Sequence, residues 1–368
     1  MKIVVTTSEL RQALKTLQKA IPNKPSLPIL QSIRFKVTKT KVTLAATDLY
    51  FGVIAPLSAE VIVEGEAAIP GKLFNTVIQS LPDESLTLEV DKEQLVVSSR
   101  ATKSTIQCMA VDDFPEFPEA SGEVRPLKTE TLMKINDLVL PSISKDVTRP
   151  VLTSVLLEFS KTGYRAVGTD GFRLSLLEEN ITGEVESTLL FPAKALSEVS
   201  RLAVLLQEDE VFLSIAQKDK QVCVQIGATW IFSRLIEGEF PPYSQIVPSS
   251  SLTNLTCDGT QLFDQLQRAS VFARESSNIV QFSCLISQVL ITTPTTSSGH
   301  FEGVLDDIQI KGEEITVNFN AQYLLDIFKQ FIDSSVKFSF TEPLKPVLCT
   351  ATNLPNFKYV VMPFRVAT

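Results

Sequence analysis

The sequence predicts an α+β protein that contains three copies of one domain of about 120 residues. Three markers recur at nearly the same interval along 368 residues. The stretches 69–74, 191–196 and 319–324 each pass from an apolar residue into a helix-like segment. Thr47 and Thr169 open a second pair of markers, and Phe114 and Phe240 belong to a third. Such self-similarity indicates a repeated fold, with expected domains at 1–124, 125–247 and 248–368.

Each copy is expected to begin with an amphipathic helix and to contain a second helix at the first marker. The opening helices are predicted at 8–21, 128–141 and 258–272. In the first of them, Leu10, Leu14 and Leu17 follow the spacing of one buried helix face. Ser8 and Asp258 are the expected N-caps, because their side chains can accept from free amides of the first turn.

Strands are expected after each helix, where β-branched and alternating apolar residues gather between turns. In the first copy they are predicted at 32–37, 41–46, 85–90 and 94–98. Each domain would then pack two helices against antiparallel sheet.

Composition limits the class of protein. With 44% hydrophobic and 21% charged residues, the chain can fill full cores, and large disordered regions are not expected. No apolar run is long enough to cross a bilayer, and the start has no signal-peptide pattern, so a cytoplasmic location and no membrane partner are expected. Five scattered cysteines without a CxxC pair predict free thiols and no metal site.

The net charge of −8 argues against a protein that grips nucleic acid over its whole surface, but it permits one basic face. Arg11, Lys15 and Lys19 recur every four residues on the first helix, away from the leucines. One interpretation is an ordinary solvated helix face. The other is a sparse set of cations that contact DNA phosphates without reading bases, which gives weak, salt-sensitive binding.

An enzyme is the main competing class, and the sequence offers little for one. The single histidine, His300, follows a Ser/Thr-rich stretch that reads as an exposed loop. No phosphate-binding glycine motif is present, and Thr169-Asp170-Gly171 reads as a turn in which Gly171 supplies a positive φ. We therefore predict no catalytic residue, cofactor or metal. A repeat scaffold that binds only proteins remains open, and the placement of the cations would distinguish it.

Several short motifs together resemble one family along nearly the whole chain. They are Leu27–Leu30, Thr47–Leu49, Asp113–Pro115, Thr169–Leu174, Gly238–Tyr243 and Tyr359–Arg365. In this order and at these spacings they resemble the β sliding clamp of bacterial DNA polymerase III. The resemblance implies a DNA clamp domain repeated three times, with helices inside and sheets outside. It also implies a head-to-tail homodimer that forms a ring around duplex DNA.

The resemblance further implies a pocket between the second and third domains for short peptides with leucine and phenylalanine anchors. Such peptides would come from the DNA polymerase III catalytic subunit, the clamp loader, and other polymerases and repair proteins. The matching positions are Leu152, Thr169, Gly171, Phe172, Arg173, Leu174, Pro241, Ile246, Asn320, Tyr323, Leu344, Val360, Met362, Pro363, Phe364 and Arg365. Met362 is expected to supply an adaptable wall, and Arg173 and Arg365 to bind peptide backbone or carboxylate groups.

For DNA contact the resemblance implies five cations, and for the dimer seam three apolar residues. The cations are Lys24, Lys72, Lys145, Arg149 and Lys194, and the seam residues are Ile106, Val271 and Phe272. Four positions depart from the family pattern. Phe172 occupies a position where the family has His, and Ser277 one where it has a pocket Phe. Pro346 replaces a small polar residue, and Ser104 replaces an apolar residue of the dimer seam. The first three departures put the peptide preference in doubt, and the last puts the apolar character of the seam in doubt.

Overall fold

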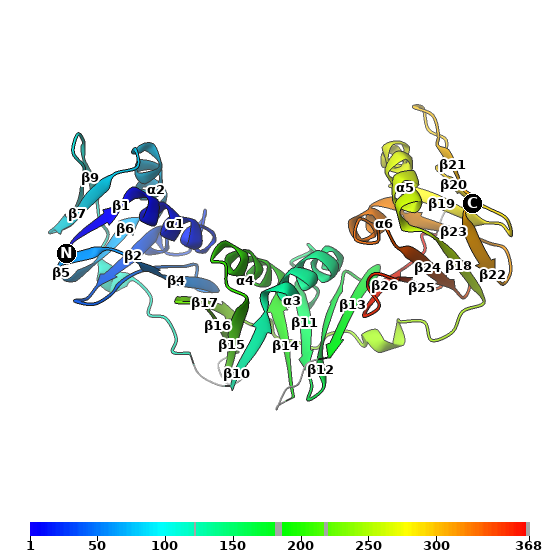
Figure 1. The fold of residues 1–368 in the computed structure, drawn as a ribbon, viewed down its shortest axis with the longest axis horizontal. Coiled ribbons are helices and arrows are strands. Elements are labelled where there is room, and N and C mark those ends of the chain that lie inside the picture. Colours follow the sequence, from blue (N-terminus) through cyan, green and yellow to red (C-terminus); the bar gives the residue numbers. More distant parts are fainter. Residues whose placement is uncertain (121–122, 181–185, 217–219, 366–368) are drawn as a thin grey trace. The chain divides into compact units, whose positions relative to one another are not determined.

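The computed structural model describes residues 1–120, 123–180, 186–216 and 220–365 (Figure 1). Two compact units emerge. The first comprises residues 1–132 and 194–235, and the second comprises residues 133–193 and 236–368. The predicted middle copy is divided between these units, so the three boundaries expected from the sequence remain a prediction. Every strand pairing in the described residues is antiparallel.

The first unit contains a five-stranded sheet and an eight-stranded sheet. The five-stranded sheet has the order β5 (Glu60–Val63), β1 (Lys2–Thr6), β7 (Ser85–Asp91), β8 (Gln94–Ser98) and β9 (Lys103–Gln107). The eight-stranded sheet has the order β10 (Glu123–Lys128), β15 (Glu210–Ala216), β16 (Gln221–Ile226), β17 (Thr229–Arg234), β4 (Phe51–Leu57), β3 (Val42–Thr47), β2 (Ser32–Val37) and β6 (Gly65–Pro70).

The second unit contains a nine-stranded sheet and a four-stranded sheet. The nine-stranded sheet has the order β14 (Ser187–Pro192), β11 (Ser154–Phe159), β12 (Gly163–Thr169), β13 (Arg173–Asn180), β26 (Phe357–Val361), β25 (Val347–Ala351), β24 (Ser335–Phe340), β18 (Thr253–Asp258) and β22 (Ile308–Lys311). The four-stranded sheet has the order β21 (Glu302–Leu305), β20 (Val289–Thr292), β19 (Ile279–Cys284) and β23 (Ile315–Asn320).

Six α-helices lie in the described residues, two for each predicted copy. They are α1 (Thr7–Leu17), α2 (Gly71–Ser80), α3 (Thr129–Lys134), α4 (Ala193–Leu205), α5 (Gly259–Ala273) and α6 (Ala321–Phe328). The predicted buried face of α1 is confirmed, since Leu10, Leu14 and Leu17 are at most 2% exposed. Helix α3 is shorter than expected, because the chain widens into a π-helical turn over Ile135–Val139. None of these helices is long and apolar enough to span a bilayer.

The N-cap predicted for the first helix is wrong, whereas the N-cap predicted for α5 is confirmed. Thr6 rather than Ser8 caps α1: its hydroxyl accepts from the Glu9 amide at 3.3 Å, and the Glu9 carboxylate accepts from the Thr6 amide at 3.4 Å. This reciprocal capping box satisfies two amides and starts the helix earlier. At α5, the Asp258 carboxylate accepts from the Gln261 amide at 2.8 Å.

The turn between β3 and β4 is closed by two side chains. The Thr47 hydroxyl donates to the Phe51 carbonyl at 3.0 Å and accepts from the Leu49 amide at 3.0 Å. The Asp48 carboxylate accepts from the amides of Tyr50 and Phe51 at 2.9 and 2.7 Å. Leu49 is held at a φ of 77°, which is unusual for a residue with a side chain.

The turn between β12 and β13 repeats this pattern bond for bond. The Thr169 hydroxyl donates to the Arg173 carbonyl at 2.6 Å and accepts from the Gly171 amide at 3.1 Å. The Asp170 carboxylate accepts from the amides of Phe172 and Arg173 at 2.9 and 3.0 Å. The expected positive φ of Gly171 is confirmed at 92°. The repeat predicted from the two Thr-Asp markers is therefore present in atomic detail.

Two strand pairs join successive copies. Strand β17, the last strand of the middle copy, pairs with β4 of the first copy, and we call this pairing the first junction (Figure 1). Strand β26, the last strand of the third copy, pairs with β13 of the middle copy, and this pairing is the second junction (Figure 1). At each junction, strands of two successive copies thus form one continuous sheet.

All five cysteines are free, as predicted. Four are buried, and Cys108 is partly exposed. Burial raises the pKa of the Cys223 thiol to about 11 and that of the Cys284 thiol to about 12, because a thiolate is poorly solvated inside the protein. These thiols pack as small apolar side chains.

Candidate functional site

Several of the predicted peptide-pocket residues meet at the second junction. Leu174 pairs with Val360, Ile246 packs against the cluster that contains them, and Arg173 lies over the Tyr323 ring. The other members remain predictions, and the exposure of the whole set is mixed. The exposed members are Gly171, Phe172, Leu344, Phe364 and Arg365; the half-buried members are Pro241, Ile246, Asn320, Tyr323, Met362 and Pro363; the buried members are Leu152, Thr169, Arg173, Leu174 and Val360. A main-chain bond joins Phe172 to Met362, which are 190 positions apart in the sequence.

Exposed apolar side chains form the rim of this group. Phe172 is 59% exposed, Leu344 47% and Phe364 40%. Two main-chain bonds hold the rim: the Met362 amide donates to the Phe172 carbonyl at 2.8 Å, and the Phe364 amide donates to the Asn318 carbonyl at 2.6 Å. Because large apolar residues seldom gather on a surface without a partner, this rim is a candidate interaction site.

A rigid apolar core lies beneath the rim. Leu174 and Val360 are 1% exposed and pair across the junction. They belong to a buried cluster against which the half-buried Phe240, Tyr243 and Ile246 of the preceding segment pack. The Tyr243 hydroxyl donates to the Glu158 carboxylate at 2.5 Å, and burial together with this bond raises the pKa of Tyr243 to about 12. A firm floor of this kind keeps side-chain pockets open for a ligand.

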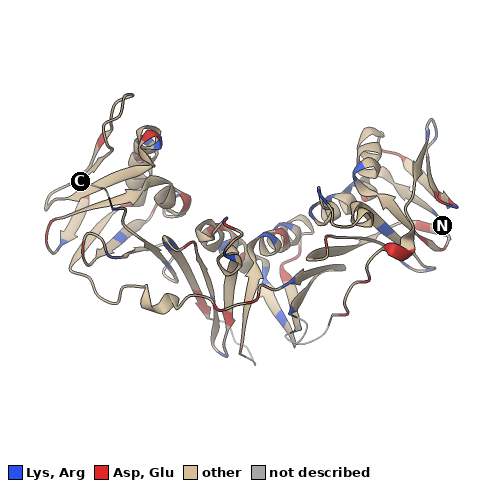
Figure 2. Ribbon diagram, turned by 180° about the vertical axis from the view of Figure 1, so that it is seen from behind, with Lys and Arg blue, Asp and Glu red and all other residues tan. Residues whose placement is uncertain are grey.

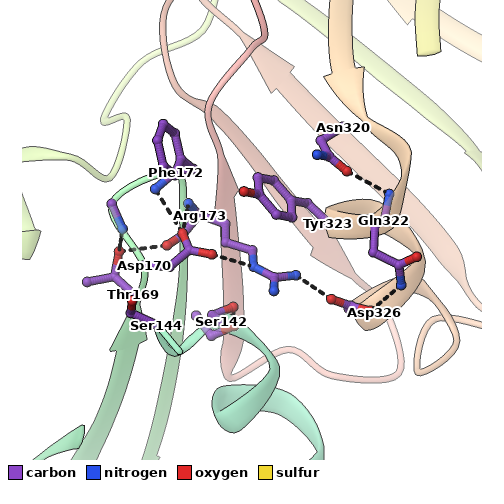
Figure 3. Close-up of polar contacts among 12 residues, drawn as sticks. Ser142, Ser144, Thr169, Asp170, Phe172, Arg173, Asn320, Gln322, Tyr323 and Asp326 are labelled. Carbon is purple, nitrogen blue, oxygen red and sulfur yellow. Dashed lines mark hydrogen bonds and ion pairs between the residues drawn. The ribbon is translucent and has the colours of Figure 1, made fainter. Parts of the chain in front are cut away.

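The Arg173 guanidinium connects the two copies (Figure 3). It donates to the Asp170 carboxylate at 3.0 Å and to the Asp326 carboxylate at 2.6 Å, and it lies 4.4 Å from the centre of the Tyr323 ring. Its side chain is 9% exposed. Gln322 in turn donates to Asp326 at 2.7 Å, so hydrogen bonds connect Asp170, Arg173, Asp326 and Gln322 in one chain (Figure 3).

Paired carboxylates further stabilise the cationic form of Arg173. Burial would lower the pKa of the guanidinium, but interactions with Tyr359, Asp326 and Asp170 outweigh it and hold the pKa above its ordinary value. The sequence suggested that Arg173 binds a peptide, and it gave no signal for Asp326, which is 153 positions away. Because both carboxylates already engage its donors, Arg173 fastens the second junction.

Two departures from the family pattern lie near this site. Ser277 is exposed at the end of the helical stretch after α5, with a φ of 56°, and Pro346 is half-buried immediately before β25. Neither adds an apolar side chain of the size of phenylalanine. The exposed Phe172 supplies such a side chain in the turn between β12 and β13.

The five predicted DNA-contacting cations are all exposed. In the described part of the chain, no carboxylate lies within ion-pair distance of Lys24, Lys72 or Lys194. The six α-helices carry seven Lys or Arg and five Asp or Glu, a net charge of +2 in a chain of net charge −8 (Figure 2). The helices thus differ in the sign of their charge from the chain as a whole, and the assignment of the five cations to DNA contact stays a prediction.

Two of the helix arginines have structural contacts. The Arg11 guanidinium donates to the Leu81 carbonyl at the end of α2. The Arg201 guanidinium donates to the Glu198 carboxylate at 2.5 Å and to the Lys15 carbonyl at 3.3 Å. These two cations are therefore engaged within the first unit, and Lys15 remains exposed beside them.

The predicted seam residues differ in exposure. Ile106 on β9 is 3% exposed and belongs to its own core, whereas Val271 on α5 is 63% exposed. Phe272 is half-buried and stacks on Phe301, with ring centres 6.4 Å apart. Val304 on β21 is 42% exposed, and sequence reasoning did not name it. Its place on an edge strand is visible only in the structure.

Comparison with known proteins gives a consistent result. The N-terminal, central and C-terminal domain models of the DNA polymerase III beta subunit match residues 1–118, 126–242 and 244–365. The beta sliding clamp of Synechocystis sp. is 29% identical over the full length of both chains.

Solved structures agree with these matches. The DNA polymerase III beta subunit of Thermotoga maritima superposes with a TM-score of 0.91 at 28% identity, covering both chains fully. The C. crescentus beta sliding clamp, solved with polyethylene glycol in its proposed β-motif tethering region, gives 0.93 at 26% identity with the same coverage. The chain therefore belongs to the DNA polymerase III beta subunit family, whose members are DNA sliding clamps that act as processivity factors and not as enzymes.

Proposed function

We propose that two copies of this chain join head to tail into a ring around duplex DNA and tether the DNA polymerase III catalytic subunit through the pocket at the second junction. The observation that carries the proposal is that two particular strands, β9 and β21, each lie at the edge of a sheet. In the described residues, β9 ends the five-stranded sheet and β21 ends the four-stranded sheet, each with one unpaired edge.

These two edges are the counterparts of strands that are paired elsewhere. Strand β9 closes the first copy as β17 and β26 close the second and third. Strand β21 occupies the position in the third copy that β4 occupies in the first copy and β13 in the second. At both junctions these two kinds of strand pair with each other. Pairing β9 of one chain with β21 of another would repeat the same joint, and such heterologous contacts close into rings.

Hydrogen-bond alternation supports the same pairing. The Ser99 amide donates to the Thr102 carbonyl, and the Thr293 amide donates to the Phe301 carbonyl. These bonds mark Ser99–Thr102 and Thr293–Phe301 as hydrogen-bonded pairs, and bonded and non-bonded pairs alternate along an antiparallel ladder. Thr105 on β9 and Val304 on β21 therefore fall in non-bonded pairs, and their main-chain N–H and C=O groups point away from the neighbouring strand. The Val304 carbonyl accepts from Nε2 of Gln265 at 3.4 Å, whereas the Val304 N–H and both main-chain groups of Thr105 are available to a second chain.

Weak electrostatic contact is sufficient for a closed ring. The exposed Lys24, Lys72 and Lys194 would meet phosphates, which carry no base information. Few such contacts give non-specific affinities of about 10⁻⁴–10⁻⁶ M. Closure around the duplex, rather than affinity, would then keep the protein on DNA and leave it free to slide. Family membership favours this function over the scaffold that binds proteins only.

Topological retention gives a direct test. Loaded onto nicked circular DNA by a clamp loader, the protein should stay bound at a salt concentration that abolishes its binding to linear DNA. Cutting the circle once should release it, because the ring then slides off the ends. Gel filtration of labelled protein with the DNA measures both states. Retention on the cut DNA would show that charge, not closure, holds the protein.

The pocket suits a short peptide with leucine and phenylalanine anchors. Phe172, Leu344 and Phe364 offer apolar surface, and the flexible Met362 can adapt its shape to different ligands. The catalytic subunit, the clamp loader, other polymerases and repair proteins would compete for it. Tethering would raise the effective concentration of each partner at the primer end.

The mutation Met362→Ala should reduce the affinity for a Gln-Leu-x-Leu-Phe type peptide at least tenfold, since it removes an adaptable apolar wall. Fluorescence anisotropy with the labelled peptide measures the loss. Met133→Ala is the matched control, because Met133 is 46% exposed on α3 and does not belong to the pocket group. Equal affinities for the wild type and Met362→Ala would remove the pocket assignment.

A further inference from the structure

The first junction has the same design as the second, but the chain fills it with its own side chain. Phe117, in the segment after β9, lies against Phe232 of β17 with ring centres 5.2 Å apart. Thr47, Leu49 and Tyr50 border it, and their counterparts in the repeated turn are Thr169, Gly171 and Phe172, which we assign to the proposed peptide pocket. A cavity of about 140 Å³ remains beside the ring.

A single residue difference makes room for this ring. Gly52 pairs with Thr47 and with Phe232, just as Leu174 pairs with Thr169 and with Val360. A Cβ atom on Gly52 would lie 2.5 Å from Cε1 of Phe117, closer than carbon atoms can approach. At the second junction the leucine side chain of position 174 fills the corresponding place. The glycine therefore permits an aromatic side chain to enter from outside the sheet.

Charge complementarity holds the entering segment. The Arg34 guanidinium donates to the Glu116 carboxylate at 2.9 Å and lies 5.5 Å from the centre of the Phe114 ring. On the other side, Arg234 lies 5.4 Å from the ring centre of Tyr50. The segment 112–119 contains four acidic and no basic residues. The site thus presents cations to an acidic segment with a phenylalanine between two prolines.

From this arrangement we propose that the first junction is a second peptide-recognition site. Its resting occupant is residues 114–118 of the same chain, and its ligand class is an acidic Phe-Pro peptide that a partner protein can supply in trans. The tethered segment competes at an effective concentration on the order of millimolar, so a partner must displace Phe117 to enter. The proposal shares its peptide-binding premise with the second junction but uses different residues.

The probe is a fluorescein-labelled peptide with the sequence of residues 111–120, added to the full-length dimer. The mutation Phe117→Ala removes the ring that lies against Phe232 and so weakens the hold of the tethered segment, and this variant should bind the probe at least tenfold more tightly than the wild type does. Adding Gly52→Leu should abolish the gain, because a leucine side chain refills the space. Phe212→Ala is the matched control, since Phe212 is an exposed phenylalanine elsewhere in the first unit.

Two further measurements keep the outcome decisive. In the wild type, millimolar unlabelled peptide should speed hydrogen exchange at the amides of Glu116 and Phe117, and this needs no variant to fold. Probe binding should persist in Met362→Ala, which separates this site from the second junction. Equal probe binding by the wild type and Phe117→Ala would overturn the proposal. So would binding that Met362→Ala removes.

Discussion

The mutation Val304→Pro is expected to convert the dimer into monomers at micromolar concentration. Proline removes an outward N–H from β21 and leaves the facing carbonyl without a donor, while the ladder to β20 loses no bond. An unsatisfied group costs about 1–3 kcal/mol, so dissociation should become roughly a hundredfold easier. Size-exclusion chromatography with light scattering measures the mass of the particle against 40.6 kDa for one chain.

Controls for this experiment separate main-chain pairing from side-chain contact. Val304→Ala keeps the amide and should leave most of the dimer intact. Thr105→Pro, on the facing edge β9, should reproduce the loss, since Thr105 also directs its amide outward. If both proline variants remained dimeric with an unchanged dissociation constant, the strand-pairing model of the seam would be wrong.

The mutation Arg173→Ala is expected to lower the free energy of unfolding by about 3–5 kcal/mol, since it leaves the carboxylates of Asp170 and Asp326 without their cation. Both are largely buried, with side chains 14% and 27% exposed. Urea denaturation followed by circular dichroism measures the change in the free energy of unfolding.

Arg165→Ala is the matched control for this loss. Arg165 also pairs with a carboxylate, Glu178 at 2.8 Å, but its side chain is 57% exposed. Solvent screening limits such a pair to at most about 1 kcal/mol. Similar small losses for the two variants would mean that the Arg173 network does not fasten the second junction.

Local features of the fold could be predicted from the sequence because they depend on neighbouring residues. The buried face of α1 follows from leucine spacing, and the turn at Gly171 follows from the short motif around it. The N-cap was misplaced because both Thr6 and Ser8 can cap, and only Thr6 has a partner, Glu9, three residues later.

Features that join distant segments could not be predicted in the same way. The pairings β4 with β17 and β13 with β26 use main-chain groups, which every residue carries and which leave no pattern in the side chains. The contact of Arg173 with Asp326 likewise spans two copies. The residues assigned to the pocket come from a family resemblance, and the contact of Phe117 with Phe232 is visible only in the structure.

Each chain has one edge of the β9 kind and one of the β21 kind, so an assembly made from them has a polarity. Two chains related by a two-fold axis along the central hole would present both of their second-junction pockets on the same side. One side of the assembly would then receive clients and the other would not.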